Sequence, residues 1–139
     1  MYRLGITKSS IKMVHTSKET DMIYTSYFAK YRGDNGVSIA RSQPMKNGVP
    51  YYEELNEFRP PAWLLEGFKN GTITEKELKH YYKNVVLQGF NPIAWGKRLQ
   101  GKVLLCWEKP GDFCHRHIVA DWLRKAGYEV KEWDKSDGV

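Results

Sequence analysis

The stretch Val103–Ala126, VLLCWEKPGDFCHRHIVADWLRKA, decides the fold of this chain. It opens with the apolar run Val103–Trp107, whose composition favours a buried strand. A turn follows at Pro110–Asp112. Apolar residues then recur at helical spacing, and Gly127 marks a helix end. These apolar residues are Ile118, Val119, Trp122, Leu123 and Ala126. The stretch therefore predicts a strand, a turn and a helix.

This arrangement brings both cysteines of the chain to one end of the expected strand. Cys106 lies near the carboxyl end of the strand, and Cys114 and His115 lie in the first turn of the helix. Glu108 follows Cys106 by two residues, so the two share a strand face if the strand extends that far. Unpaired N–H groups at a helix start favour an anion and lower the pKa of a cysteine. We therefore expect a site in which Cys114 has a lower pKa than Cys106, and His115 or Glu108 moves protons.

The same residues also have structural interpretations. Cys106 alone fits a small buried apolar side chain. His115 precedes Trp122 by seven residues, so it shares the inward helix face and fits a core histidine with satisfied hydrogen bonds. A disulfide between Cys106 and Cys114 is geometrically conceivable, but the absence of an export signal favours free thiols in a reducing compartment. Taken together, C-x-E followed by C-H-R favours a functional site.

The stretch Leu104–Leu123 resembles the motif of the DUF488 family (domain of unknown function 488), which reads strand, C-x-E, short loop, C-H-R, helix. Weaker resemblance extends to Ile23–Phe28 and Val37–Pro44, so that it covers roughly residues 22–133. The resemblance implies a small α/β fold and brings no established reaction.

The chain departs from the family at one position. Many members read Asp-Val-Arg where this chain has Ile39-Ala40-Arg41, so the arginine matches and the acidic residue is absent. Either the role of that acid is lost here, or Glu108 fills it.

Strands and helices are expected to alternate along the chain, which favours a single small α/β domain with a mostly parallel central sheet flanked by helices. Residues 22–133 form this domain, residues 1–21 an N-terminal arm or edge segment, and residues 134–139 a frayed tail. The further strands are expected at Met22–Phe28, Val37–Arg41 and Tyr128–Trp133, and the further helices at Pro60–Phe68, Thr74–Leu87 and Ile93–Leu99.

Ligands of such sheets bind outside the carboxyl ends of the strands. One expected strand ends in Arg41-Ser42 and another in Cys106, so Arg41 and the C-H-R turn line one crevice if these strands are neighbours. Arg41 and Arg116 are then the expected holders of a phosphate or carboxylate, with Ser42 beside them. Tyr24 belongs to a group of aromatic residues that either stack on bases or pack in the core.

Net charge narrows the expected partners. The chain of 139 residues carries +6, and residues 1–50 hold eight basic against three acidic residues. This balance fits an anionic small molecule, a nucleotide or nucleic acid as partner, or else a solvated surface without one. The hydrophobic content is 41%, and the sequence contains neither a long apolar run nor an export signal. These features indicate a cytoplasmic protein that has no membrane partner.

Bound cofactors and metals are not expected. The chain lacks a glycine-rich phosphate loop and a dinucleotide fingerprint. Cys106, Cys114, His115 and His117 offer metal ligands, but their spacing C-x7-C-H-x-H matches no standard zinc pattern.

The leading interpretation is a small cytoplasmic enzyme that acts on a nucleotide-like or nucleic-acid substrate through a pocket of Cys106, Glu108, Cys114 and His115. The alternative is a non-catalytic module that binds an anionic ligand or nucleic acid in the same pocket. A third is a metal-stabilised structural domain.

Overall fold

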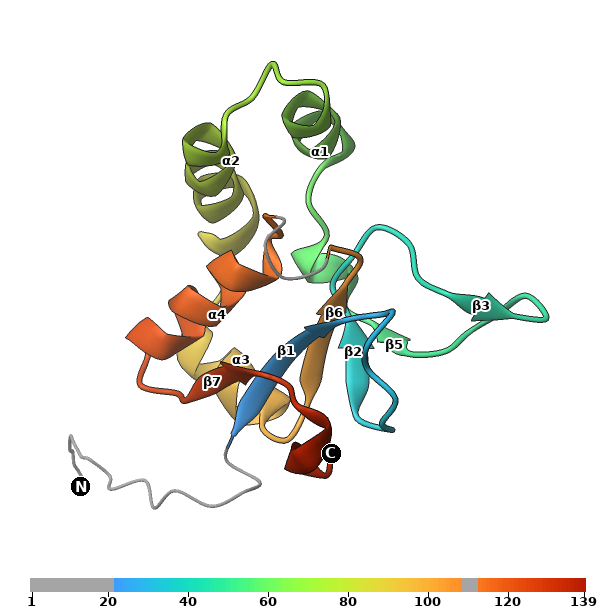
Figure 1. Cartoon of the computed structure of the whole chain (residues 1–139). Coiled ribbons are helices and arrows are strands. Elements are labelled where there is room, and N and C mark those ends of the chain that lie inside the picture. The colour runs from blue at the N-terminus through green and yellow to red at the C-terminus, as the bar shows by residue number, and fades with distance from the viewer. Residues whose placement is uncertain (1–21, 109–112) are drawn as a thin grey trace, which may run out of the picture.

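A computed structural model describes residues 22–108 and 113–139. Its main sheet has five strands in the order β5-β2-β6-β1-β7, and every pair of neighbours is parallel. The expected α/β class with a parallel central sheet is confirmed (Figure 1). The strands are β1 (Ile23–Tyr27), β2 (Gly36–Ser38), β5 (Glu53–Glu54), β6 (Val103–Cys106) and β7 (Val130–Glu132).

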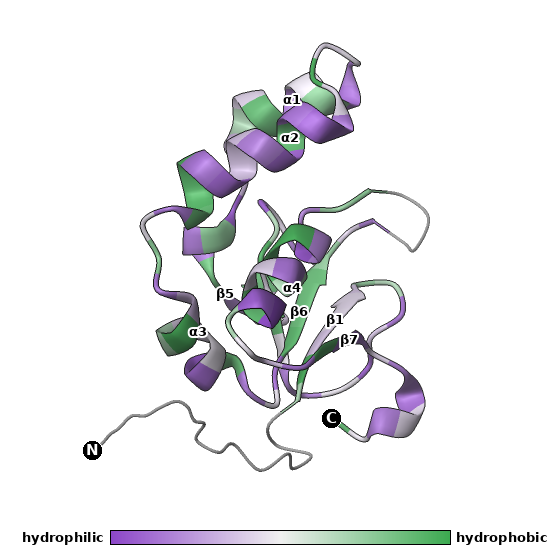
Figure 2. Cartoon of the chain, turned by 90° about the vertical axis from the view of Figure 1, so that its left-hand side faces the viewer, coloured by the Kyte–Doolittle hydropathy of each residue, from purple (hydrophilic) through white to green (hydrophobic). Residues whose placement is uncertain are grey.

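Helices cover one face and one end of this sheet. α4 lies against the sheet, and α1 and α2 stand beyond the carboxyl ends of the strands (Figure 1). The outward side of α4 is hydrophilic, whereas β6 is hydrophobic throughout (Figure 2). Within the described residues, no helix is both long and apolar enough to cross a membrane. The helices are α1 (Ala62–Lys69), α2 (Glu75–Tyr81), α3 (Pro92–Leu99), α4 (Arg116–Lys125), the short 3-10 turns η2 (Asn56–Phe58) and η4 (Lys135–Asp137), and the π-helix η3 (Tyr82–Leu87).

The helix starts follow local sequence signals. The Thr74 hydroxyl accepts from the backbone N–H of Glu77, whose carboxylate accepts from the N–H of Thr74, so the capping box of α2 is complete. The Asn91 side chain caps α3 in the same sense, with Pro92 in the first turn. The long helix expected over residues 74–87 is instead α2 followed by η3, whose wider turn buries Tyr82 and Leu87.

The strands β1 and β2 are not neighbours, because β6 lies between them. Residues 28–35 carry the chain from the end of β1 to the start of β2, across β6. β6 is the central strand, and its four residues are all buried. This position is typical of a strand that reads as a continuous apolar run.

The segment Ser42–Pro50 contains a hairpin that projects from the body of the molecule (Figure 1). Its antiparallel strands are β3 (Met45–Lys46) and β4 (Val49–Pro50). Asn47 and Gly48 connect them, with φ angles of 53° and 79°. Two positive φ angles are typical of a tight hairpin turn, for which Asn-Gly is the preferred sequence.

Two cores fill the two faces of the sheet. One lies under α3 and α4 and includes Ile23, Leu104 and Val119. The other lies on the opposite face, where residues 28–35 and the C-terminal residues cover it (Figure 1). Its members are Tyr24, Phe28, Tyr31, Ala40, Val103, Leu105, Cys106, Cys114 and Trp133.

The C-terminal residues are ordered rather than frayed. η4 follows β7, and the Lys131 ammonium lies 2.8 Å from the Asp137 carboxylate. Val139 packs against the second core, and its carbonyl oxygen lies where a Cβ of Gly33 would stand. The expectation of a frayed tail at 134–139 is therefore wrong, because the tail covers one face of the sheet. The expected arm at 1–21 and turn at Pro110–Asp112 lie outside the described residues.

The contact between Gly96 of α3 and the Tyr128 ring makes a sharp test of packing. A Cβ at Gly96 would lie within van der Waals overlap of several ring atoms. We expect Gly96→Ala to lower the free energy of unfolding by about 1–3 kcal/mol, as overpacking usually does. Gly89 is the matched control, because a Cβ there meets no atom within 4 Å. Urea denaturation of both variants measures the difference, and equal stabilities would show that the ring moves aside without cost.

Candidate functional site

A cleft of about 490 Å³ lies where α1 and α2 face the start of α4 and the end of β6. Its floor is formed by Glu108, Cys114 and His115, the side chains that the sequence motif predicts as a site. Its walls are mostly apolar, with Lys69 of α1 and Glu75 of α2 as charged members. The remaining wall residues are Pro60, Leu65, Phe68, Leu78, Tyr82 and Phe113.

A smaller pocket of about 130 Å³ adjoins this cleft and shares Glu108 and His115 with it. Its lining also includes Arg41, Ser42 and Trp107. Arg41 and Ser42 come here because β2 and β6 are neighbours, so the residues after both strands meet at one edge. Arg41 therefore lines this pocket together with His115 of the C-H-R turn, whereas Cys106, Cys114 and Arg116 are not among its lining residues. The Arg41 guanidinium is exposed and donates to the Pro60 carbonyl at 3.2 Å.

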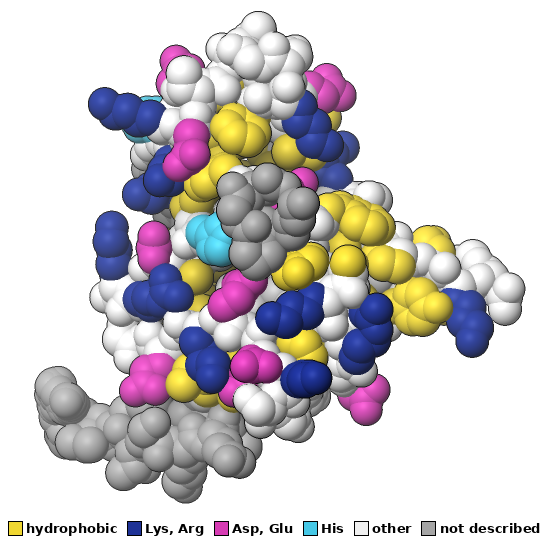
Figure 3. All heavy atoms as spheres, viewed as in Figure 1, with side chains coloured by type: hydrophobic (Ala, Val, Ile, Leu, Met, Phe, Trp, Pro, Cys, Tyr) yellow, Lys and Arg dark blue, Asp and Glu magenta, His cyan; other side chains and the backbone are white. Residues whose placement is uncertain are grey.

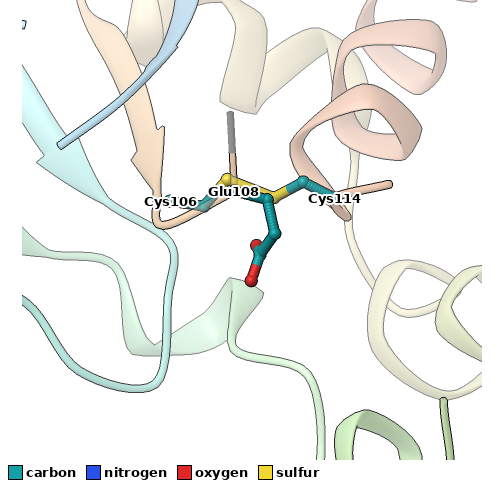
Figure 4. Close-up of side chains that lie close together, drawn as sticks. All are labelled: Cys106, Glu108 and Cys114. Carbon is teal, nitrogen blue, oxygen red and sulfur yellow. A yellow bond between two sulfur atoms is a disulfide. The ribbon is translucent and has the colours of Figure 1, made fainter. Parts of the chain in front are cut away.

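Cys106 and Cys114 are joined by a disulfide, and both are buried. The expectation of free thiols is therefore wrong for this form of the protein, because the end of β6 and the residue before His115 converge. The Glu108 carboxylate lies beside the disulfide and points away from it (Figure 4). Neither cysteine titrates while bonded. The expected lower pKa of Cys114 concerns the reduced protein and stays a prediction.

His115 is the N-cap residue of α4, and one of its ring nitrogens has a hydrogen-bond partner in the backbone. Nε2 lies 2.7 Å from the Ile39 carbonyl oxygen, which only accepts, so Nε2 carries the proton. Nδ1 is then an acceptor, and it lies 3.7 Å from Sγ of Cys114. Burial lowers the pKa of His115 from 6.5 to about 4, against the opposing effect of the Ile39 hydrogen bond. The ring is therefore a neutral base at neutral pH, and it both packs like a core histidine and lines the cleft.

Arg116 is not placed as the sequence interpretation requires. It is completely buried, and its guanidinium lies 3.0 Å from the Glu132 carboxylate of β7. It also donates to Sγ of Cys106 at 2.9 Å and to the Glu108 carbonyl. The expectation that Arg116 holds a phosphate or carboxylate is not supported, because its guanidinium contacts these protein groups instead. Helical spacing explains this, since Arg116 precedes Leu123 by seven residues on the buried face of α4.

Tyr24 is also removed from the cleft. It stands near the start of β1, where Val103 of β6 is its neighbour, and it is buried in the second core. Its place at the amino half of the strand separates it from the carboxyl ends, where Glu108 and His115 lie. The ligand-binding role expected for Tyr24 is therefore not supported, and core packing describes this residue.

One group of described residues has metal-ligand character. The sulfurs of Cys106 and Cys114 and a carboxylate oxygen of Glu108 all lie within 4.8 Å of one another. A soft metal such as Zn²⁺ would suit two thiolates and a carboxylate, but only after reduction of the disulfide. The Arg116 guanidinium on Sγ of Cys106 places a positive charge beside the group and opposes a cation there. His117 is exposed and stands outside the group.

Several residues of the site are not predicted by the sequence patterns. Lys69 and Phe113 line the cleft, and the Ile39 carbonyl fixes the tautomer of His115. Glu132 neutralises Arg116 from a strand that lies two places from β6. No local pattern marks these residues, because each enters the site through the packing of separate elements. Compared with known proteins, the chain matches no family model, no curated protein and no solved structure.

Proposed function

We propose that the protein is a small thiol-dependent enzyme, with Cys114 as nucleophile and His115 as its base. The observation that carries this proposal is the pairing of Sγ of Cys114 with Nδ1 of His115 at 3.7 Å, on the floor of the cleft. An imidazole whose other nitrogen is held by a carbonyl is oriented to accept a proton from a thiol.

The substrate that suits this site is anionic and nucleotide-like, or a nucleic acid. Arg41 and Lys69 are the cations beside the floor of the cleft and its adjoining pocket. Phe68 and Phe113, which also line the cleft, form an edge-to-face pair whose ring centroids are 5.6 Å apart. Cations and aromatic rings around one cleft suit a phosphate joined to a flat ring.

The proposed chemistry begins with reduction of the disulfide by a cellular dithiol, which gives two electrons and two protons and becomes a disulfide itself. The Cys114 thiol then passes its proton to Nδ1 of His115 as sulfur bonds to an electrophilic atom of the substrate. The bond from that atom to its leaving group breaks, and the leaving group takes the proton from the imidazolium. Water, deprotonated by His115, releases the second product and restores the thiol. Glu108 lies beside the sulfur and orients water or substrate.

A specific observation favours a second candidate. The two cysteines are bonded and buried, as in a structural disulfide, so the cleft fits a module that binds an anionic ligand without chemistry. In that case the disulfide fixes the start of α4 against the end of β6.

Thiol reactivity separates the two candidates. After reduction, we expect the Cys106→Ser variant, which retains Cys114, to react with iodoacetamide faster near pH 7 than the Cys114→Ser variant. His115→Gln should slow the reaction of Cys114 by about tenfold or more, since general base catalysis contributes at least that much. Mass spectrometry of the alkylated protein across pH measures both rates.

Each other outcome points to a different assignment. If the protein that retains only Cys106 reacts faster, Cys106 is the nucleophile. If neither cysteine reacts without denaturant, the thiol mechanism fails and the binding module stands. A nucleotide or oligonucleotide incubated with the reduced wild-type protein should yield a product that the Cys114→Ser variant does not form.

A further inference from the structure

Two large exposed aromatic side chains line two different pockets. Trp107 is 48% exposed and Tyr51 is 57% exposed. The Trp107 indole nitrogen donates to the carbonyl and hydroxyl oxygens of Ser42 at 3.0 and 3.2 Å. The Trp107 ring packs edge-to-face on Phe28, with centroids 4.6 Å apart. An exposed ring that is held in this way offers its free face without losing conformational freedom on binding.

The rings form one connected surface, which we name the aromatic track: Trp107, Phe28, Tyr52 and Tyr51. Phe28 and Tyr52 are stacked with centroids 6.0 Å apart, and Tyr52 lies 6.2 Å from Tyr51. Phe28 is buried and supports the track from below, whereas the other three rings reach the surface. The track begins in the pocket that adjoins the cleft and continues into a second cavity of about 650 Å³.

The groups beside the track suit a nucleic-acid strand. Arg32 and Lys102 line the second cavity, and Arg41 lines the pocket at the other end. Figure 3 shows Lys and Arg side chains around hydrophobic ones on this face of the molecule. Two carboxylates, Asp34 and Glu53, also line the cavity. They match the amino groups of nucleobases, and Glu53 already faces Arg98 at 3.6 Å.

We propose that the aromatic track binds single-stranded nucleic acid and leads one end of the strand into the cleft. Stacked bases lie on Trp107, Tyr52 and Tyr51, and the phosphates meet Arg32, Lys102 and Arg41. Base stacking on exposed rings tolerates any sequence, because every base has a flat face. Duplex DNA is excluded, because its bases are already stacked and turned inward. This inference names single-stranded nucleic acid as the substrate of the proposed enzyme. It rests on the proposed function for the chemistry alone, because binding to the track does not require a reaction.

The probe is a fluorescein-labelled ten-residue oligothymidine, titrated with the oxidised full-length protein and followed by anisotropy. We expect Trp107→Ala and Tyr51→Ala each to weaken binding by about tenfold, the usual loss when one stacking ring is removed. Trp107→Phe should recover most of the loss, because a ring is restored. Three phosphate contacts predict a slope of about −2 for log K against log salt, and Arg32→Gln should make it shallower.

Trp63 supplies the matched control. It is a tryptophan of α1 that is 52% exposed, but it packs on Tyr81 and stands apart from the track. Trp63→Ala should bind the oligonucleotide as the wild-type protein does. Melting temperatures show that each variant is folded.

Four results overturn the proposal: no binding of the oligonucleotide, equal binding by the two ring variants and wild type, equal binding of a duplex, or equal affinity for free thymidine monophosphate. The last would make the track a nucleotide pocket. This test uses the oxidised protein and does not depend on thiol chemistry. If the thiols prove unreactive after reduction, the enzyme proposal fails and the binding test still applies.

Discussion

Arg116→Ala is expected to lower the free energy of unfolding by about 2–3 kcal/mol, less than the loss for a fully buried ion pair because the Glu132 side chain is 35% exposed. The Arg116 guanidinium is completely buried and holds the Glu132 carboxylate, Sγ of Cys106 and the Glu108 carbonyl together. Its removal leaves a cavity and leaves these acceptors without their hydrogen-bond donor. Urea denaturation of the oxidised protein measures the loss.

Two further variants sharpen this prediction. Lys125→Ala, at the exposed end of the same helix, should change stability by less than about 0.5 kcal/mol. Arg116→Lys keeps the charge but not the planar fork, so it should recover only part of the loss. An Arg116→Ala variant as stable as the wild type would mean that the guanidinium is replaced by water and does not stabilise the fold.

Stability is expected to fall by about 3 kcal/mol between pH 6.5 and pH 4 because of His115 alone. Its pKa in the folded protein is about 4, lowered by burial from 6.5. As the pH falls below 6.5, the unfolded chain binds a proton that the folded protein does not bind until about pH 4. The stability contribution of the neutral ring is therefore complete above pH 6.5 and is lost as the pH falls. The Arg116 and His117 charges act in the same direction on this pKa.

The comparison of variants isolates this effect from the titration of carboxyl groups. His115→Gln cannot take up a proton, so its stability should vary less between pH 6.5 and pH 4 than that of the wild type. His80→Gln removes an exposed histidine of α2 and should leave the wild-type profile unchanged. Thermal or urea unfolding across pH provides the curves. Parallel curves for wild type and His115→Gln would show that His115 binds its proton equally in both states.

Much of the fold follows from patterns within single elements. The apolar run of β6, the helical spacing of α4, the Thr74 capping box and the Asn91 cap each predict the observed element. The hairpin at Asn47-Gly48 also has a local signal, because Asn-Gly is the preferred pair for a tight hairpin turn. β5 has none, because two glutamates become a strand only by pairing with β2.

Part of the candidate site also follows from local sequence patterns, and the rest depends on tertiary packing. The spacing of Cys106, Glu108, Cys114 and His115 is enough to bring them together, because a strand, a short connection and a helix fix their relative positions. The disulfide and the burial of Arg116 depend on how α4 turns against the sheet. The inward position of Arg116 follows from its helical spacing to Leu123. A buried charge normally needs a partner, however, and the partner Glu132 comes from another strand, so the spacing alone does not predict the burial.

The sequence by itself determined the class of the fold, the central strand and helix, and which residues of the motif meet. Only the tertiary structure decided that β6 separates β1 from β2, that Ile39 holds His115 and that Trp107, Phe28, Tyr52 and Tyr51 form one surface. The physical reason is the distance along the chain over which each effect acts. Periodicity and turn chemistry act over a few residues, whereas strand order and side-chain contacts between distant elements are set by the simultaneous burial of all of them.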